Sequence, residues 1–99
     1  MSGEYKVLLN DASTVGASAH LPFTEGRGTI IAQGTFAHHS NTVDVECSFD
    51  GTNFVPIQGL TGINEPIAIP FELAHKVFIR ARLTYIQEDH TPSITVAVC

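Results

Sequence analysis

The feature that most constrains this chain is a strict alternation of apolar and polar residues over positions 43–49. The apolar residues stand at every second position: Val43, Val45, Cys47 and Phe49. Such alternation is typical of a β-strand with one buried face. Asp50-Gly51 and a second apolar run, 54–57, follow directly. This order predicts a β-hairpin, because glycine tolerates a positive φ and an Asp side chain can bond its own backbone.

The same Asp-Gly stretch could be taken for a ligand site, and the alternative must be weighed. A calcium loop needs several acidic or amide ligands at fixed spacing, and Asp50 is the single acid here. We therefore expect a corner of a sheet and not a binding loop.

Short apolar or alternating runs recur along the whole chain, with turn residues between them at intervals of roughly 8–12 residues. The runs are 5–9, 15–21, 28–36, 42–49, 54–58, 66–71, 76–85 and 93–98. No window has apolar residues at helical spacing over three turns, and 72–75 could form one helical turn at most. The pattern predicts an all-β fold, an antiparallel β-sandwich of about seven or eight strands, Ig-like or jelly-roll-like.

The length of 99 residues suits a single domain over 1–99. Within it, residues 1–27 are the least patterned part and include a run of small residues at 10–19. This part could be a partly extended N-terminal arm that orders against a neighbour, or a surface loop. The sequence leaves both alternatives open.

The run 76–85 assigns its faces clearly. Its apolar face consists of four residues: Val77, Ile79, Ala81 and Leu83. Its polar face carries Arg80 and Arg82, which have the spacing to meet Asp44 and Glu46 across a sheet as ion pairs. Two arginines on one face could instead bind an acidic partner. The available acids make a neutralised sheet surface the favoured interpretation.

The charge balance restricts the partners that the chain could bind. Its formal net charge is -5, from ten acidic and five basic residues. An acidic chain repels phosphate backbones, so we expect no nucleic-acid partner. No stretch approaches the roughly 18 apolar residues of a membrane span, and no secretion signal is evident. We therefore expect no membrane partner and a protein that is made in a cytoplasm.

The charged fraction is low, at 15% of the residues, where about a quarter is usual. A surface with few ions is easier to bury against a partner, because fewer charges lose their water. Small β domains that use Thr, Ser and Asn on their exposed faces have the same composition. Both interpretations stay open.

The residues that could carry chemistry are not arranged for it. The five histidines are His20, His38, His39, His75 and His90. His38 and His39 are adjacent, and neighbours on an extended chain point to opposite sides, so the pair is a poor chelator. A metal bound between chains is the minor alternative. The sequence has no Gly-x-Ser-x-Gly, phosphate loop or Cys-x-x-Cys, so we expect no enzyme, no metal and no cofactor.

The two cysteines are Cys47 and Cys99. Cys47 shares its alternation phase with three apolar residues, so we expect a buried, reduced thiol. Two cysteines in a chain without an export signal give weak grounds for a disulfide.

Several segments together carry a resemblance to a known group. They are Gly28 to Phe36, then Val43 to Ile57 with its Ser48-Phe49-Asp50-Gly51, then Phe71-Glu72-Leu73, then Val77 to Ala81 with Arg80-Ala81. In this order the chain resembles small β-sandwich structural proteins of tailed bacteriophages over residues 28–98. In that group the aromatic after Asp-Gly is often Trp, and here it is Phe54.

The resemblance implies a virion protein, most like a capsid decoration (cement) protein on the outer surface of the shell. It would be non-catalytic, made in the host cytoplasm, and bound to the major capsid protein. We expect a homo-oligomer, with a trimer favoured, because several linked copies gain avidity. Loop tips are expected to make the contacts: His38, His39, Ser40, Asn41, Glu88, Asp89 and His90.

A different class of function remains as the alternative. A small β-sandwich can be a sugar- or receptor-binding module of a tail fibre or adhesin. Carbohydrate platforms of this kind use exposed Trp and Tyr, and the chain has no Trp and only two Tyr. The aromatic composition therefore favours the decoration protein over the sugar-binding module.

Overall fold

The computed structural model describes residues 5–13, 16–17, 21–23, 26–36, 42–84 and 93–99. Within these residues the chain forms nine strands and no helix. The strands are β1 (Lys6–Ala12), β2 (Gly16–Ala17), β3 (Leu21–Phe23), β4 (Gly26–Thr35), β5 (Val43–Ser48), β6 (Val55–Pro56), β7 (Ile67–Leu73), β8 (Val77–Leu83) and β9 (Ser93–Val98).

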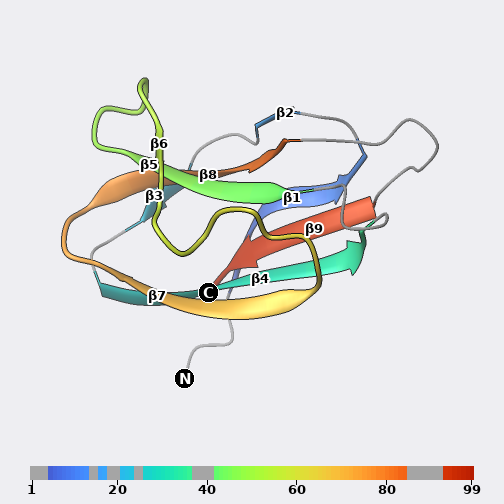
Figure 1. Cartoon of the computed structure of the whole chain (residues 1–99). Coiled ribbons are helices and arrows are strands. Elements are labelled where there is room, and N and C mark those ends of the chain that lie inside the picture. Colours follow the sequence, from blue (N-terminus) through green and yellow to red (C-terminus); the bar gives the residue numbers. More distant parts are fainter. Residues whose placement is uncertain (1–4, 14–15, 18–20, 24–25, 37–41, 85–92) are drawn as a thin grey trace.

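The strands form two antiparallel sheets. The first has the order β1-β9-β4-β7, and the second has the order β2-β8-β5-β6, with β3 also paired to β8. Figure 1 shows β9, β4 and β7 side by side in the first sheet and β8 beside β5 in the second. The predicted all-β, antiparallel architecture is confirmed at this level.

The strand count differs from the prediction at the run 15–21. This run forms two short strands, β2 and β3, which both pair with β8. Pro22 lies inside β3, opposite Phe78, and does not end it. A proline is tolerated there because β3 is an edge strand, whose outer side needs no ladder hydrogen bond. The possible helical turn at 72–75 is wrong, because β7 continues as a strand to Leu73.

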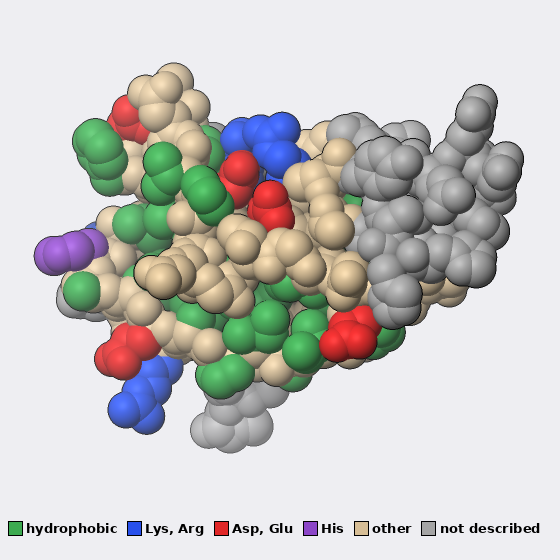
Figure 2. Space-filling model, viewed as in Figure 1, with side chains coloured by type: hydrophobic (Ala, Val, Ile, Leu, Met, Phe, Trp, Pro, Cys, Tyr) green, Lys and Arg blue, Asp and Glu red, His purple; other side chains and the backbone are tan. Residues whose placement is uncertain are grey.

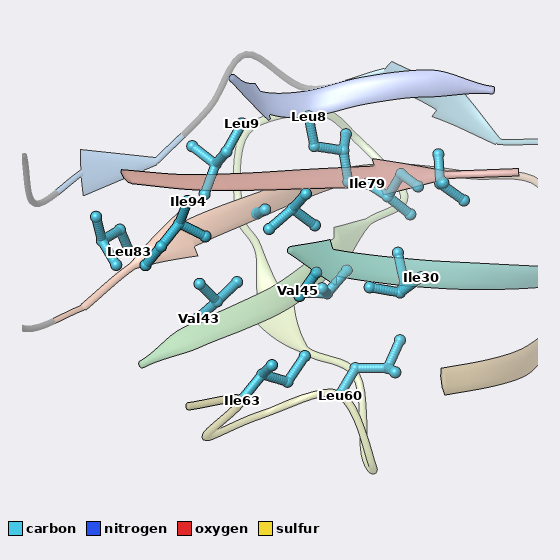
Figure 3. Close-up of a cluster of buried hydrophobic side chains, with 14 of the residues drawn as sticks. Leu8, Leu9, Ile30, Val43, Val45, Leu60, Ile63, Ile79, Leu83 and Ile94 are labelled. Atoms are coloured by element: carbon cyan, nitrogen blue, oxygen red, sulfur yellow. The ribbon is translucent and has the colours of Figure 1, made fainter. Parts of the chain in front are cut away.

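One hydrophobic core draws on both sheets, as Figure 3 shows. The first sheet contributes Leu8, Leu9, Ile30, Ala32, Ile94, Val96 and Val98, and the second contributes Val43, Val45, Ile79, Ala81 and Leu83. Three more core residues, Ile57, Leu60 and Ile63, come from the connection between β6 and β7. The apolar face predicted for β8 is confirmed, since Ile79, Ala81 and Leu83 are each at most 1% exposed.

The alternation predicted for β5 fails at its C-terminal end. Val43 and Val45 are buried, but Cys47 is only half-buried and Phe49 is 86% exposed. Ser48 is buried instead, at 4% exposure. The strand ends at Ser48, and the chain turns so that the Ser48 hydroxyl can hold the turn. The alternation therefore predicts the wrong side of the strand for Phe49, which faces solvent and not the core.

The cysteine predictions are half right. Both Cys47 and Cys99 are free, so the two thiols are reduced and unpaired. Cys47 is not fully buried, yet its partial burial raises the pKa of its thiol. An apolar surrounding disfavours the thiolate and makes the group less reactive.

The N-terminal part of the chain contributes to the first sheet. β1 pairs with β9 and places Leu8 and Leu9 in the core. Its pairing register shifts twice, between Val7 and Leu9 and between Leu9 and Ala12. Several parts of the predicted arm, 1–4, 14–15, 18–20 and 24–25, lie outside the described residues, so the arm stays a prediction there.

Candidate functional site

The loop residues expected to contact a partner lie outside the described part of the chain. They are His38, His39, Ser40, Asn41, Glu88, Asp89 and His90. Their contact role therefore stays a prediction. The surface features below come from the described residues alone.

The Asp-Gly stretch forms the predicted hairpin. β5 and β6 pair through Glu46 with Pro56 and through Cys47 with Val55. Gly51 has a φ of 76°, which a residue with a side chain rarely adopts. The sequence signal and the observed turn thus agree.

A dense hydrogen-bond network makes this turn rigid. The Ser48 Oγ accepts from the backbone N–H of Asp50 at 3.2 Å and of Gly51 at 2.9 Å, and it donates to Asp50 Oδ1 at 2.7 Å. Asp50 Oδ1 also accepts from the backbone N–H of Thr52 at 2.9 Å and of Asn53 at 3.0 Å. These bonds hold the pKa of Asp50 well below its usual range, with the Ser48 hydroxyl as the largest cause. Its carboxylate is thus engaged by its own turn.

The outside of this turn is apolar. Phe49 is 86% exposed and Val55 is 59% exposed. We call residues 49–55 the tip. Figure 2 shows apolar side chains gathered over the β5–β6 hairpin at the upper left of the molecule. An exposed aromatic on a rigid support is typical of a protein-binding anchor, because little entropy is lost when it docks.

The arginines of β8 are engaged within their own sheet. Arg80 Nε lies 2.7 Å from Glu46 Oε1, and Arg82 Nε lies 3.4 Å from Glu46 Oε2. The Arg80 guanidinium also lies 4.0 Å from the centroid of the Phe54 ring. The predicted cross-strand pairing is confirmed with one change. Both arginines meet Glu46, while Asp44 accepts a hydrogen bond from the Gly62 backbone at 2.8 Å.

The edge strand β7 presents a second apolar feature, which we call the β7 strip and define as residues 67–71. Ile67 is 40% exposed, and Ala68 and Pro70 are also exposed. Ile69 and Phe71 are half-buried at the margin of the core. A groove of about 150 Å³ runs between Ile67, Ile69 and the connection 61–65. Because side chains alternate along a strand, Ile67, Ile69 and Phe71 lie on the core face of β7, and Ala68 and Pro70 lie on its outer face. The strip therefore makes this edge of the first sheet apolar on both faces.

Pro70 prevents a further strand from pairing with the free edge of β7. Thr29 exchanges both backbone hydrogen bonds with Cys99, so its polar groups point toward β9. Pro70 lies opposite Thr29 in the β4–β7 pair. Two directly opposed residues of an antiparallel pair point their backbone N–H and C=O groups either toward each other or away from each other. Because those of Thr29 point away from β7, the backbone of Pro70 faces the open edge. Since proline has no N–H, a further strand cannot complete its ladder there.

A cleft lies where β1 begins, β9 ends and β3 passes. Its volume is about 460 Å³, and its lining consists of Tyr5, Lys6, Leu21, Pro22, Phe23, Val98 and Cys99. Phe23 packs against Phe71, with ring centroids 5.2 Å apart. We call this feature the cleft. Its walls are mainly apolar, and among these lining residues Lys6 has the charged side chain.

The tip, the β7 strip and the cleft differ in how far the local sequence predicts them. Phe49 was missed because alternation assigned it to the core, although its place directly before Asp-Gly marks the end of a strand. The β7 strip had a signal in Pro70, since a proline inside an apolar run marks an edge strand. The cleft joins residues from three distant segments and had no local signal.

The described residues hold no cluster of metal-ligating side chains. No three His, Cys, Asp or Glu side chains among them lie close enough to hold a metal ion. Every buried side-chain nitrogen or oxygen in the same part of the chain has a hydrogen-bond partner. Also within these residues, no helix is long and apolar enough to cross a membrane. Comparison of the chain with protein-family models, with curated proteins and with solved structures gave no match.

Proposed function

We propose that this protein is a non-catalytic structural component of a phage virion, which decorates and stabilises the outer surface of the capsid. The resemblance of residues 28–98 to small structural proteins of tailed phages supports this proposal. We further infer that the two sheets form a β-sandwich of the Ig-like or jelly-roll-like type. The partner is the major capsid protein of the shell.

The observation that carries the proposal is the β7 strip. It makes an open sheet edge apolar on both faces, with Ile67 exposed on one face and Ala68 and Pro70 exposed on the other. Burial of apolar surface contributes about 25 cal/mol per Å². Only 15% of the chain is charged, so few ions lose their water when such a surface docks. The strip therefore suits a partner that meets the edge of the sheet, such as a protein on the outside of a shell.

The block at Pro70 fits the same role. A decoration protein must stay soluble before it meets the shell, and an open edge strand that could pair with any other strand would aggregate. With Pro70 facing that edge, contact with a partner occurs through side chains. The net charge of -5 adds mutual repulsion between free copies and argues against nucleic acid as the partner.

The test is binding of the purified protein to expanded empty phage shells, measured by co-sedimentation, together with the heat resistance of the loaded shells. Ile67→Asp should weaken binding at least tenfold, since it places a charge in the docked strip. Val7→Asp is the matched control, because Val7 is 41% exposed against 40% for Ile67 and lies on the opposite edge strand of the same sheet. It should bind as the wild type does.

Two results would count against the proposal. If the protein does not bind shells and does not raise their heat resistance, the decoration role is wrong. If both variants bind equally well, the role can stand but the β7 strip is not the docking surface. Specific hits on a glycan array without shell binding would favour the sugar- or receptor-binding module of a tail fibre.

A further inference from the structure

We infer that two copies of this chain associate by exchanging tips, with Phe49 of each copy inserted into the cleft of the other. The inference does not rest on the proposed virion function. It rests on two features of one chain that complement each other in shape, polarity and charge, and on where they lie.

The shapes match in size. Phe49 is the most exposed large apolar side chain among the described residues, at 86%. The cleft offers about 460 Å³. An apolar cavity of about 150 Å³ already holds a benzene molecule. The cleft thus has room for the phenyl ring of Phe49 together with part of the neighbouring turn.

The charges match as well. Lys6 lines the cleft, and Asp50 directly follows Phe49 in the tip. An inserted tip brings the acidic side chain of one copy toward the ammonium group of the other. In a chain with a net charge of -5, most surfaces repel a second copy. The cleft is therefore a favourable place for an acidic tip to dock.

The positions of the two features favour a reciprocal exchange. Pro22 of the cleft pairs with Phe78, and Phe78 pairs with Ser48, the residue before Phe49. Neighbouring strands lie about 4.8 Å apart, so Pro22 and Ser48 are roughly 10 Å apart in one row of the sheet. Tip and cleft thus share one end of the second sheet. A two-fold rotation that seats one tip also seats the other, which favours a dimer over the trimer expected from the sequence.

The tip is prepared for insertion. The hydrogen bonds of Ser48 and Asp50 fix the turn before any contact is made. Little entropy is therefore lost when the tip docks. The contact area of two tips is small against a standard interface, so we expect a micromolar and not a nanomolar dissociation constant.

The test is sedimentation velocity of the full chain over a concentration series that reaches millimolar protein. The wild type should form dimers. Phe49→Ala removes the inserted ring and should raise the dissociation constant about tenfold to a hundredfold for each contact. Ile67→Ala is the matched control, because it shortens an exposed apolar side chain outside the tip and the cleft. It should leave the dimer unchanged.

A mixing experiment separates this exchange from any other contact. Pro22→Glu places a carboxylate in the cleft and should also dissociate the dimer, because it repels Asp50 of the incoming tip. Mixed with Phe49→Ala, it should form a heterodimer that retains one intact contact. The second contact carries both changes, and a contact that one change has already broken loses little more from the other, so that heterodimer should be tighter than either variant alone. Circular dichroism and thermal melts show that each variant is folded.

The inference is overturned by any of three results. The wild type could stay monomeric at all concentrations. It could associate in a manner that neither variant changes, or it could form trimers. The experiment contains no shells, so its failure leaves the proposed function to its own test.

Discussion

Replacing Gly34 with alanine should be one of the most destabilising small changes in this chain. Gly34 lies in β4 opposite Ile94 of β9 and has a φ of 115°. A Cβ at this position would overlap the carbonyl oxygen of Ser93 and lie 3.2 Å from the Ile94 Cα. The neighbouring atoms belong to the backbone of a paired strand, so no flexible side chain can move aside.

Two costs add up in the Gly34→Ala variant. The unfavourable φ costs about 1–2 kcal/mol for a residue with a side chain. The forced separation of β4 and β9 resembles overpacking, which costs about 1–3 kcal/mol. The expected loss is therefore about 2–5 kcal/mol of the free energy of unfolding, a large part of the roughly 5–15 kcal/mol of a typical domain.

Gly26→Ala isolates the second cost. Gly26 begins the same strand with a similar φ of 126°, but a Cβ there meets nothing within 4 Å. It should lose only the backbone term of about 1–2 kcal/mol. Urea denaturation of both variants measures the two losses on one scale. Equal losses would show that β4 and β9 do not approach closely at Gly34, and would refute the reasoning.

Three further predictions follow from the hairpin, the ion pairs and the thiol. Because the pKa of Asp50 is lowered in the folded protein, its stabilising contribution is complete above the unfolded pKa of about 3.9 and is lost as the pH falls below it. Asp50→Asn should therefore remove part of the acid dependence of stability, measured by urea denaturation between neutral and acidic pH; an unchanged dependence would contradict this. Glu46→Ala should cost about 1–2 kcal/mol, because it leaves both arginines of β8 without their carboxylate; the exposed Glu72→Ala is the control, and an equal loss from both would speak against the pairing. Cys47 should react with a thiol reagent more slowly than the exposed Cys99, because burial raises its pKa and limits access; equal rates would count against the described packing of β5.

The local sequence pattern predicted the elements whose structure depends on local chemistry. The faces of β8 follow from alternation, because Ile79, Ala81 and Leu83 all meet one core. The β5–β6 hairpin follows from Asp-Gly, because glycine accepts the positive φ at the turn.

The sequence failed where two local tendencies compete. Alternation places Phe49 inside, but the strand ends at Ser48, whose hydroxyl is needed to bond the turn. Hydrogen-bond satisfaction of the turn prevails over apolar burial at that position. The expected end at Pro22 is wrong for a different reason, because an edge strand accepts a proline without losing a ladder bond and β3 continues to Phe23.

The sequence also failed where the contact is distant. Leu60 and Ile63 complete the core because backbone hydrogen bonds with Val45 and Val43 tie their connection to β5. The residues around Leu60 and Ile63 carry no local pattern that predicts this packing of the connection against β5. The cleft likewise exists only after β1, β3 and β9 have met, so no single run could announce it.

The most direct test of the central claim is hydrogen exchange of the protein free in solution and bound to expanded phage shells. The backbone N–H groups of Ala68 and Glu72 face the open edge of β7, since each stands two residues from Pro70 and shares its orientation. We predict that peptides covering Ile67–Leu73 exchange more slowly on the shell, while peptides covering Lys6–Ala12, on the other edge of the same sheet, exchange at an unchanged rate. Unchanged exchange over Ile67–Leu73 in the shell-bound protein would contradict the assignment of β7 as the surface that meets the capsid.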